Sequence, residues 1–342
     1  MTRALAFGAA ALLLAACGTS GDGGDTTAAE GGGADGGGCE VNGEAYPSGP
    51  IEYIMPYAAG GGTDVLGRAL AQGMSDELGV QVNVVNMPEG SAVVGKTALA
   101  NAEPDGSTIG SVTVQTMIYP RVGLGNVTKD DLTPISVVST VPAGVTVRAD
   151  APYDSIEELL AYAEENPGEL VGSGTGAGGV WDIARAGMLI EAGLPLDTIR
   201  WVPSQGAAPA LQEVLAGGID ISFASLQENQ AMIEEGRVKA LAVMADEREE
   251  GFPDVPTLTE QGVDFTHSVW RGVGGPAGLP DCVVETLDGA VATTVESQEF
   301  IDFMANTNSA ITYMDAAETA EFWEEQDQAM AELIDQMGIG TS

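Results

Sequence analysis

From residue 50 onward, short apolar runs rich in β-branched residues alternate with segments whose apolar side chains recur at helical spacing. The first run predicts a strand over Ile51–Met55, and Val65, Leu66 and Leu70 begin the helical pattern that follows it. Alternation of this kind is typical of α/β proteins with parallel sheets. Further strands are predicted over residues 108–112, 135–140, 144–148, 170–172, 199–202, 219–223 and 240–244.

Two later helices carry clear signals of their ends or of their packing. Ser155 and Glu158 form a capping-box pattern, and the sequence Asn-Pro-Gly at 166–168 ends that helix. Near the C-terminus a single apolar stripe predicts a packed helix rather than a partner motif; it comprises Phe322, Ala329, Met330, Leu333, Ile334 and Met337.

Three glycine-rich or polar loops each join a predicted strand to a predicted helix, at residues 56–64, 173–179 and 203–208. The helices that follow the last two are expected over 180–192 and from about 209 to 215, and Thr63 or Asp64 is suited to cap the first. A helix N-terminus presents unpaired N–H groups and a positive dipole end, which bind anions without Lys or Arg. Three such loops predict one shared anion site, although each loop alone could be a tight turn.

The N-terminal residues have the pattern of an export signal. Arg3 precedes an apolar run over residues 4–16, too short for a membrane anchor, and Leu-Ala-Ala-Cys at 14–17 resembles a bacterial lipobox with Cys17 as the lipidated residue. The alternative is an ordinary cleavage site with an incidental cysteine. Residues 18–38 contain ten glycines, and this composition predicts a flexible tether spanning about 25 Å.

The remaining cysteines are Cys39 and Cys282. In an oxidising compartment they could form a disulfide, but two unpaired thiols fit the sequence equally well, since spacing does not report the distance between them.

Composition and motifs exclude several classes of function. The 342 residues hold 51 Asp and Glu against 12 Lys and Arg, a net charge of −39 that excludes nucleic acid and anionic lipid surfaces as partners. The one histidine, His267, is interpreted as a surface or satisfied interior residue, and no His-rich zinc site or GxSxG motif occurs. The sequence therefore predicts no catalytic residue, no metal and no cofactor.

One enzyme motif remains as an alternative. Residues 174–179 match GxGxxG between a strand and a helix, as in dinucleotide-binding folds. The next strand leads into Pro203, Ser204 and Gln205 and lacks the acidic residue that such folds need. An exported dinucleotide- or anion-binding enzyme using this loop is one alternative function, and a non-transport protein of the cell envelope is another.

Several ordered motifs resemble the extracytoplasmic substrate-binding proteins of tripartite tricarboxylate transporters, the Bug family. They cover almost all of residues 50–338 and lie at 56–64 with Arg68, 102–108, 206–211, 215–220, 240–243 with Arg248, 253–262, and Trp270 with 276–280. After residues 84–88 this chain has Glu-Gly-Ser-Ala-Val-Val-Gly at 89–95, where the family usually has a Gly-Ala-Gly-Gly turn. This departure argues against close ligand approach by that loop.

The resemblance implies a two-lobed α/β fold of the periplasmic-binding-protein type (type II, Venus flytrap) with a hinge between the lobes. It places the signal peptide at residues 1–16, the lipidated cysteine and linker at 17–49, lobe 1 at 50–145 plus 250–342, and lobe 2 at 146–249. The chain should cross between lobes near 143–148 and 244–257. The implied function is an extracytoplasmic, lipid-anchored monomer, not an enzyme, that captures a small di- or tricarboxylate or related organic acid and delivers it to a membrane permease.

In such proteins one carboxylate of the ligand is held by the first glycine loop and by the corresponding loop of the other lobe. Carried onto this sequence, the resemblance implies ligand contacts from Tyr57, Ala59, Gly60, Gly61, Thr63, Asp64, Ser173, Thr175, Gly176, Gly178, Gly179, Gln205 and Gly206. For Asp64, capping the helix and touching the ligand remain equal alternatives.

Overall fold

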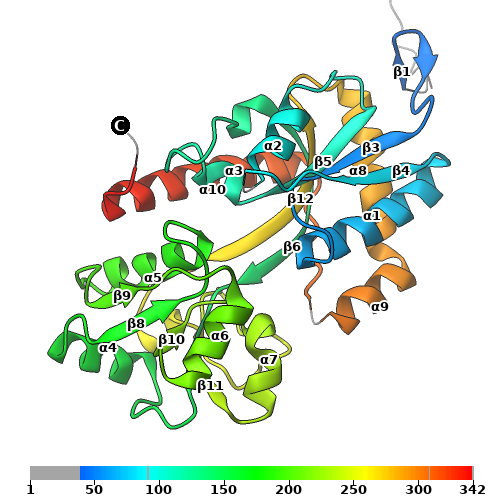
Figure 1. The fold of residues 1–342 in the computed structure, drawn as a ribbon. Coiled ribbons are helices and arrows are strands. Elements are labelled where there is room, and N and C mark those ends of the chain that lie inside the picture. The colour runs from blue at the N-terminus through cyan, green and yellow to red at the C-terminus, as the bar shows by residue number, and fades with distance from the viewer. Residues whose placement is uncertain (1–38, 91, 308, 341–342) are drawn as a thin grey trace, which may run out of the picture. The chain divides into compact units, whose positions relative to one another are not determined.

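The computed structural model describes residues 39–90, 92–307 and 309–340. The predicted signal peptide, Cys17 and residues 18–38 of the linker lie outside these residues. These described residues belong to one compact unit. In its described part the strands form two five-stranded sheets and a small hairpin of β1 (Glu40–Val41) with β2 (Glu44–Ala45) (Figure 1).

The first sheet has the strand order β4-β3-β5-β12-β6. Its strands are β3 (Ile51–Met55), β4 (Val82–Asn86), β5 (Thr108–Thr113), β6 (Leu132–Pro142) and β12 (Ser268–Pro276). Its helices are α1 (Gly62–Leu78), α2 (Val93–Ala100), α3 (Gln115–Ile118), α8 (Asp281–Glu296), α9 (Gln298–Asn306) and α10 (Ala316–Met337), with a 3-10 turn at Lys129–Asp131.

Helix α1 packs on this sheet because its apolar residues recur every four positions. Leu66, Leu70 and Met74 are buried in one core with Tyr53 of β3 and Leu287 of α8. The helix ends where Gly79 adopts φ 67°, a left-handed conformation that favours glycine. This packing fixes the N-terminus of α1 at the carboxyl end of β3.

The second sheet has the order β11-β7-β10-β8-β9. It comprises β7 (Gly144–Arg148), β8 (Leu170–Ser173), β9 (Ile199–Trp201), β10 (Ile221–Ser222) and β11 (Val238–Val243). The helices of this half are α4 (Ile156–Glu165), α5 (Val180–Glu191), α6 (Ala207–Ala216) and α7 (Leu226–Glu234), with a 3-10 turn at Thr259–Gln261.

The prediction of parallel sheets is only partly right, since both sheets are mixed. β12 lies antiparallel to β5 and β6, and β7 lies antiparallel to β10 and β11. The cause is the path of the chain. β6 leads out of the first sheet toward the second, and β12 brings the chain back into the first sheet after the second is complete, so β12 runs opposite to its neighbours. The α/β, two-lobed prediction is confirmed.

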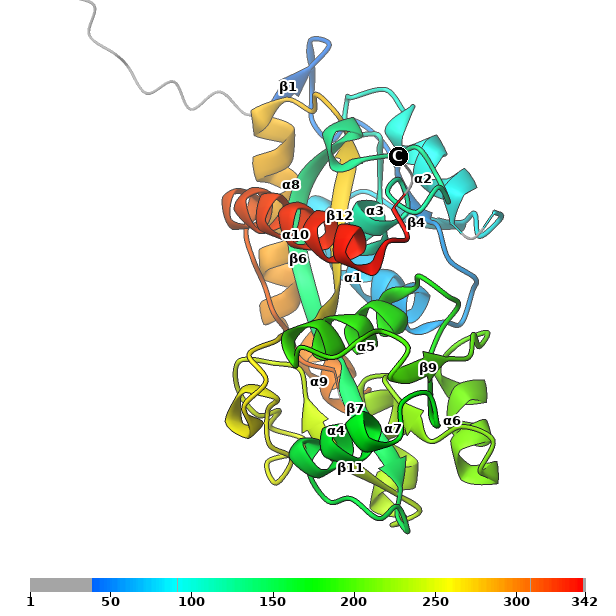
Figure 2. The same cartoon turned by 90° about the vertical axis from the view of Figure 1, so that its left-hand side faces the viewer.

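The chain passes between the two sheets at the end of β6 (Figure 2). Three backbone hydrogen bonds join the crossing segments there. The Ala143 N–H donates to the His267 carbonyl, the His267 N–H to the Met244 carbonyl, and the Met244 N–H to the Ala143 carbonyl, over 2.8–3.0 Å. Ala143 alone separates β6 from β7. Burial lowers the pKa of His267 to about 4 despite a hydrogen bond with the backbone of Val180, so the imidazole at this crossing is neutral near pH 7.

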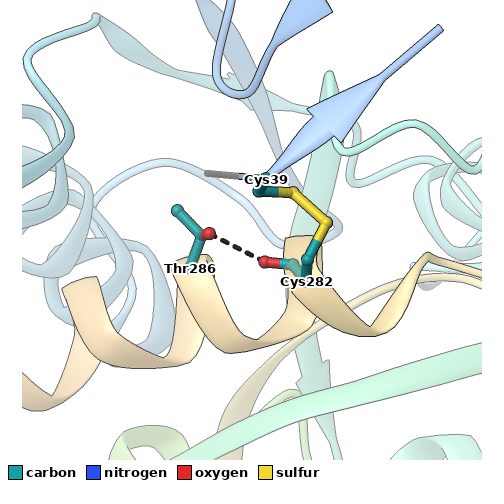
Figure 3. Close-up of a disulfide and its surroundings, with 3 residues drawn as sticks. All are labelled: Cys39, Cys282 and Thr286. Atoms are coloured by element: carbon teal, nitrogen blue, oxygen red, sulfur yellow. Dashed lines mark hydrogen bonds between the residues drawn. A yellow bond between two sulfur atoms is a disulfide. The ribbon is translucent and has the colours of Figure 1, made fainter. Parts of the chain in front are cut away.

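A disulfide joins Cys39, beside the N-terminal hairpin, to Cys282 in the first turn of α8 (Figure 3). The hydroxyl of Thr286 donates a 2.7 Å hydrogen bond to the Cys282 carbonyl one turn earlier in the helix. The bridge spans 243 residues of sequence and so ties the start of the described chain to a helix of the first sheet.

Lys96 of α2 is a buried lysine whose pKa links stability to pH. Its side chain is 4% exposed, its ammonium lies 4.6 Å from the Tyr119 ring centroid, and its Nζ has no hydrogen-bond partner among the described residues. Burial lowers its pKa from 10.5 to about 7. Between these values the unfolded chain binds a proton that the folded chain does not, so stability rises with pH across that window.

We therefore expect Lys96→Met to stabilise the protein at pH 7 by about 1–3 kcal/mol and to flatten the rise in stability between pH 7 and 10. Urea unfolding at pH 6, 8 and 10 measures both effects. Lys129→Met is the matched control, because Lys129 pairs with Asp130 and Glu324 and its loss should not stabilise. An unchanged pH slope in Lys96→Met would show that Lys96 is not the group responsible.

Candidate functional site

A cavity of about 720 Å³ lies where the loop after β3 meets the start of α1. Residues associated with both sheets line it. The first sheet and its helices contribute Tyr57, Ala58, Gly60, Gly61, Gly62, Thr63, Val65, Leu66, Val141, Arg271, Phe303 and Met304, and Thr307 and Ser309 follow α9. The half built on the second sheet contributes Gln205, Ser225, Gln227 and Glu228.

The glycine loop beside this cavity is held by Asp64. Gly60 has φ 83°, and its N–H donates to Asp64 Oδ2 at 2.8 Å. Asn86 Nδ2 donates to Asp64 Oδ1 at 2.7 Å, and Arg68 Nε donates to Oδ2 at 3.1 Å. Burial by itself would raise the pKa of Asp64, but these three hydrogen bonds and the Arg68 charge outweigh it and lower the pKa. Both carboxylate oxygens are therefore occupied within the protein.

The prediction that Thr63 or Asp64 caps α1 is wrong. The helix begins at Gly62 with Gly61 as the N-cap, and no side chain accepts a hydrogen bond there. Asp64 instead reaches back past the N-cap to Gly60. The first-turn N–H groups of α1 have no intrahelical acceptor, and Gly62 and Thr63 lie on the cavity wall, so the positive end of the helix faces the cavity.

We expect Asp64→Asn to cost about 1–3 kcal/mol of stability and to weaken ligand binding, because it removes a buried acceptor from Gly60 and Arg68 and loosens the loop. The ionised form stabilises the fold above the carboxyl's ordinary pKa, and this contribution is lost as pH falls through the lowered folded pKa. Urea unfolding at pH 7 and a binding titration measure the two effects. Asp76→Asn on the exposed face of α1 is the control, and equal stability of the two variants would refute the role of Asp64.

Arg271 is the one cationic side chain among the described residues that line this cavity. It was not among the predicted contacts, because backbone dipoles were expected to suffice for an anion. Arg271 lies in β12, the strand between β5 and β6. Its Nε donates to Thr63 Oγ1 at 3.3 Å, and no carboxylate of the described residues lies within ion-pair distance of it. Burial lowers its pKa, and nearby Glu228 and Tyr57 partly offset this, but arginine remains protonated in proteins. A cation with no ion-pair partner among the described residues thus stands beside the α1 N-terminus.

Tyr57 lies on the same wall. Its hydroxyl shares a 2.5 Å hydrogen bond with Thr113 Oγ1 and also donates to Gln115 Oε1 at 3.4 Å. Burial raises the pKa of Tyr57 well above its ordinary value, so the phenol stays neutral and acts as a polar group of fixed position.

The second glycine loop does not line this cavity, although its Thr175 carbonyl accepts a 2.9 Å hydrogen bond from the N–H of Ser204, the neighbour of the lining residue Gln205. Ser173, Thr175, Gly176, Gly178 and Gly179 are absent from its lining, and so are Ala59, Asp64 and Gly206. Ser173 donates its hydroxyl to the Val202 carbonyl at 2.7 Å, within its own half. Of the predicted ligand contacts, the structure brings together Tyr57, Gly60, Gly61, Thr63 and Gln205.

The two glycine loops nevertheless share one hydrogen-bonding arrangement, in which an aspartate of the following helix binds a loop glycine and an arginine. The Gly178 N–H donates to Asp182 Oδ2 at 2.9 Å, and Arg185 pairs with Asp182 at 2.7 Å, as Gly60, Asp64 and Arg68 do in the first loop. Gly178, like Gly60, has positive φ. The Gly-x-x-x-Asp spacing is therefore a signal for a bent loop before a helix, and it is not by itself a signal for ligand contact.

The start of α7 is the other part of the cavity that the sequence argument missed. Ser225 is the N-cap of α7, and Glu228 completes a capping box by accepting from the Ser225 N–H at 3.3 Å and from its hydroxyl at 3.1 Å. The sequence Ser-Leu-Gln-Glu at 225–228 after a strand was the available signal.

The described residues contain no group of three or more His, Cys, Asp or Glu placed to hold a metal ion. None of the helices in this part of the chain has the length and apolar character needed to cross a membrane.

Two sheets joined by crossing strands, with a ligand-sized cavity lined from both halves, define a two-lobed solute-binding protein. Residues 66–339 match the model of the tripartite tricarboxylate transporter family receptor, which covers well over half of the chain. The chain belongs to this family, and its fold and family are those of solute-binding receptors.

Individual relatives agree with this assignment. A UPF0065 protein of Bordetella pertussis is 31% identical over 306 residues, which cover 87% of this chain and 93% of that protein. A TctC solute-binding protein from Polaromonas has 35% identity and a TM-score of 0.77, covering 85% of this chain and all of the other. Malate-bound MatC from Rhodopseudomonas palustris, at 24% identity and TM-score 0.70 over 84% of this chain and all of the other, shares the fold.

Proposed function

We propose that this protein captures a small organic carboxylate, of the di- or tricarboxylate class or a related acid, outside the cytoplasm and delivers it to the permease of a tripartite tricarboxylate transporter. One observation carries the proposal: in a chain of net charge −39, the N-terminus of α1 and Arg271, which has no ion-pair partner among the described residues, line one cavity. The family description supports the transporter, and the malate named for MatC supports the class of ligand.

The geometry suggests how a carboxylate would be held. One oxygen would accept from the first-turn N–H groups of α1, and the other from the Arg271 guanidinium, whose planar fork suits a carboxylate. These groups act at contact distance, whereas surface carboxylates are screened over about 8–10 Å in physiological salt. Bulk negative charge therefore does not prevent binding of an anion.

Binding would also favour closure of the two lobes. Gln205 and the start of α7 reach the same cavity from the half built on the second sheet. A ligand that touches both walls binds the closed state more tightly than the open one, and only this difference can shift the equilibrium. The closed form is the state that a permease would recognise.

We propose no catalysis at this site. The described residues that line the cavity include no histidine or cysteine, so they offer neither a Ser-His nor a Cys-His pair to activate a nucleophile.

The leader sequence supports anchoring outside the cytoplasm through lipid on Cys17, which follows Leu14, Ala15 and Ala16. Mass spectrometry of the membrane-extracted protein should find a diacylglyceryl group on Cys17. An unmodified mature N-terminus at this residue would refute the anchor but not the binding function.

Gly61→Trp tests the proposed site against the alternative use of the second loop. Gly61 has φ −76°, and an added Cβ would meet only the Ala58 carbonyl oxygen at 3.5 Å, so the variant should fold while its indole blocks the cavity. We expect loss of binding to a panel of citrate, malate, succinate and adipate, measured by calorimetry. Gly176→Trp, whose added Cβ meets nothing within 4 Å, is the matched variant in the second loop.

Under our proposal Gly61→Trp costs far more affinity for acids than Gly176→Trp does. The dinucleotide alternative predicts that NAD binds the wild type and that Gly176→Trp alone abolishes that binding. Binding of NAD with no binding of acids would overturn the proposed function.

A further inference from the structure

Two opposite charges face the cavity from different halves of the fold. Arg271 comes from β12 and Glu228 from α7, and both line the cavity. Each affects the other's pKa, since Glu228 acts to raise that of Arg271 and Arg271 acts to lower that of Glu228. They nevertheless form no ion pair within 4 Å in the described structure. A cation and an anion therefore line one cavity with no ion pair between them in the described structure.

The capping box uses only one of the two carboxylate oxygens of Glu228. Both bonds of the capping box go to Oε2, and Oε1 accepts no hydrogen bond from any described residue. A capping box needs one acceptor oxygen and no charge, so glutamine serves equally well there. The second oxygen and the negative charge of Glu228 remain available to whatever fills the cavity.

A ligand that bears only negative charge would suit Arg271 and be repelled by Glu228. The Glu228 side chain is exposed to the cavity, yet burial within the surrounding protein raises its pKa, so water does not fully screen it. A ligand that carries a carboxylate at one end and a protonated nitrogen at the other would pair with both Arg271 and Glu228.

We propose that the preferred ligand is an amino-substituted carboxylate, whose ammonium group is bound by Glu228 while its carboxylate is bound by Arg271 and the α1 N-terminus. This inference rests on the proposed carboxylate-binding function and specifies its substrate class. Glu228 is then the residue that determines specificity for the amine.

Matched pairs of acids test this inference in the purified protein. Calorimetric titrations would compare aspartate with succinate, glutamate with glutarate, and 4-aminobutyrate with butyrate. We expect the wild type to bind at least one amino acid about ten- to a hundredfold more tightly than its partner without the amine, the effect of one charge-assisted hydrogen bond. In Glu228→Gln this preference should fall to about threefold or less, while affinity for the acid without the amine stays the same or rises.

Glu234→Gln, an exposed residue of the same helix that bonds Gln230, is the control and should retain the preference. Urea unfolding should show that Glu228→Gln keeps the stability of the wild type, since glutamine preserves the cap.

The outcomes separate this inference from the proposed function. Acids without an amine that bind as tightly as their amino partners in the wild type, or a preference for the amine that survives in Glu228→Gln, would overturn the inference and leave carboxylate binding intact. If no acid of either kind binds, the proposed function fails and the inference with it.

Discussion

Arg271→Gln is expected to weaken carboxylate binding by about ten- to a hundredfold, the loss of a charge-assisted hydrogen bond in a partly enclosed site. Because Arg271 has no ion-pair partner among the described residues, the variant should fold. Calorimetry with the acid that binds the wild type most tightly measures the effect. Arg271→Lys should give an intermediate affinity, since it keeps the charge but loses the planar fork.

Arg200→Gln is the control for this experiment. Arg200 is exposed and donates to the Gly168 carbonyl away from the cavity, so the substitution makes the same change in net charge without touching the site. Equal affinities of Arg271→Gln and Arg200→Gln would contradict the assignment of Arg271 as the counter-ion of the ligand.

Removal of the disulfide is expected to lower the free energy of unfolding by about 2–5 kcal/mol. The bridge between Cys39 and Cys282 closes a long loop of 243 residues, and cross-links of long loops restrict the unfolded chain most. Urea unfolding of the Cys39→Ser, Cys282→Ser double variant measures the loss. Ligand binding should persist in the variant, because neither cysteine lines the cavity.

A reducing agent provides the internal control for this prediction. It should shift the unfolding midpoint of the wild type to that of the double variant and leave the double variant unchanged. Coinciding midpoints for the oxidised wild type and the double variant would show that the bridge contributes nothing to stability.

Local signals predicted many elements well. The strands Ile51–Met55 and Gly144–Arg148 have the predicted bounds, and helix α4 begins after Ser155 and ends before Asn166 as the capping signals indicate. In each case the information lies within a few residues: β-branched runs, a cap, or a Pro-Gly stop. The two-lobed fold came from the family resemblance, which combines motifs spread over the whole chain.

The position of Arg271 on the cavity depends on contacts between residues distant in the sequence, so it was not predicted. β12 joins the first sheet between β5 and β6 after more than a hundred intervening residues, which places Arg271 beside Thr63. Nothing within residues 268–276 indicates that neighbour. The same reason explains Glu228, whose capping box was readable in the sequence but whose position on the cavity was not.

The glycine loops show that similar local sequences can have different positions relative to the cavity. Residues 56–64 and 173–179 look alike in the sequence because both bend through a glycine of positive φ held by an aspartate. Only the tertiary structure places the first on the cavity with Arg271 and leaves the second outside it.

The most direct test of the central claim is a calorimetric titration of the purified, ligand-free protein with mono-, di-, tri- and amino-substituted carboxylates. We expect saturable binding of a chemically related subset of these acids with one site per chain, and loss of that binding in Gly61→Trp. A folded protein that binds none of them, or that binds them equally well with Gly61 replaced by Trp, would contradict it.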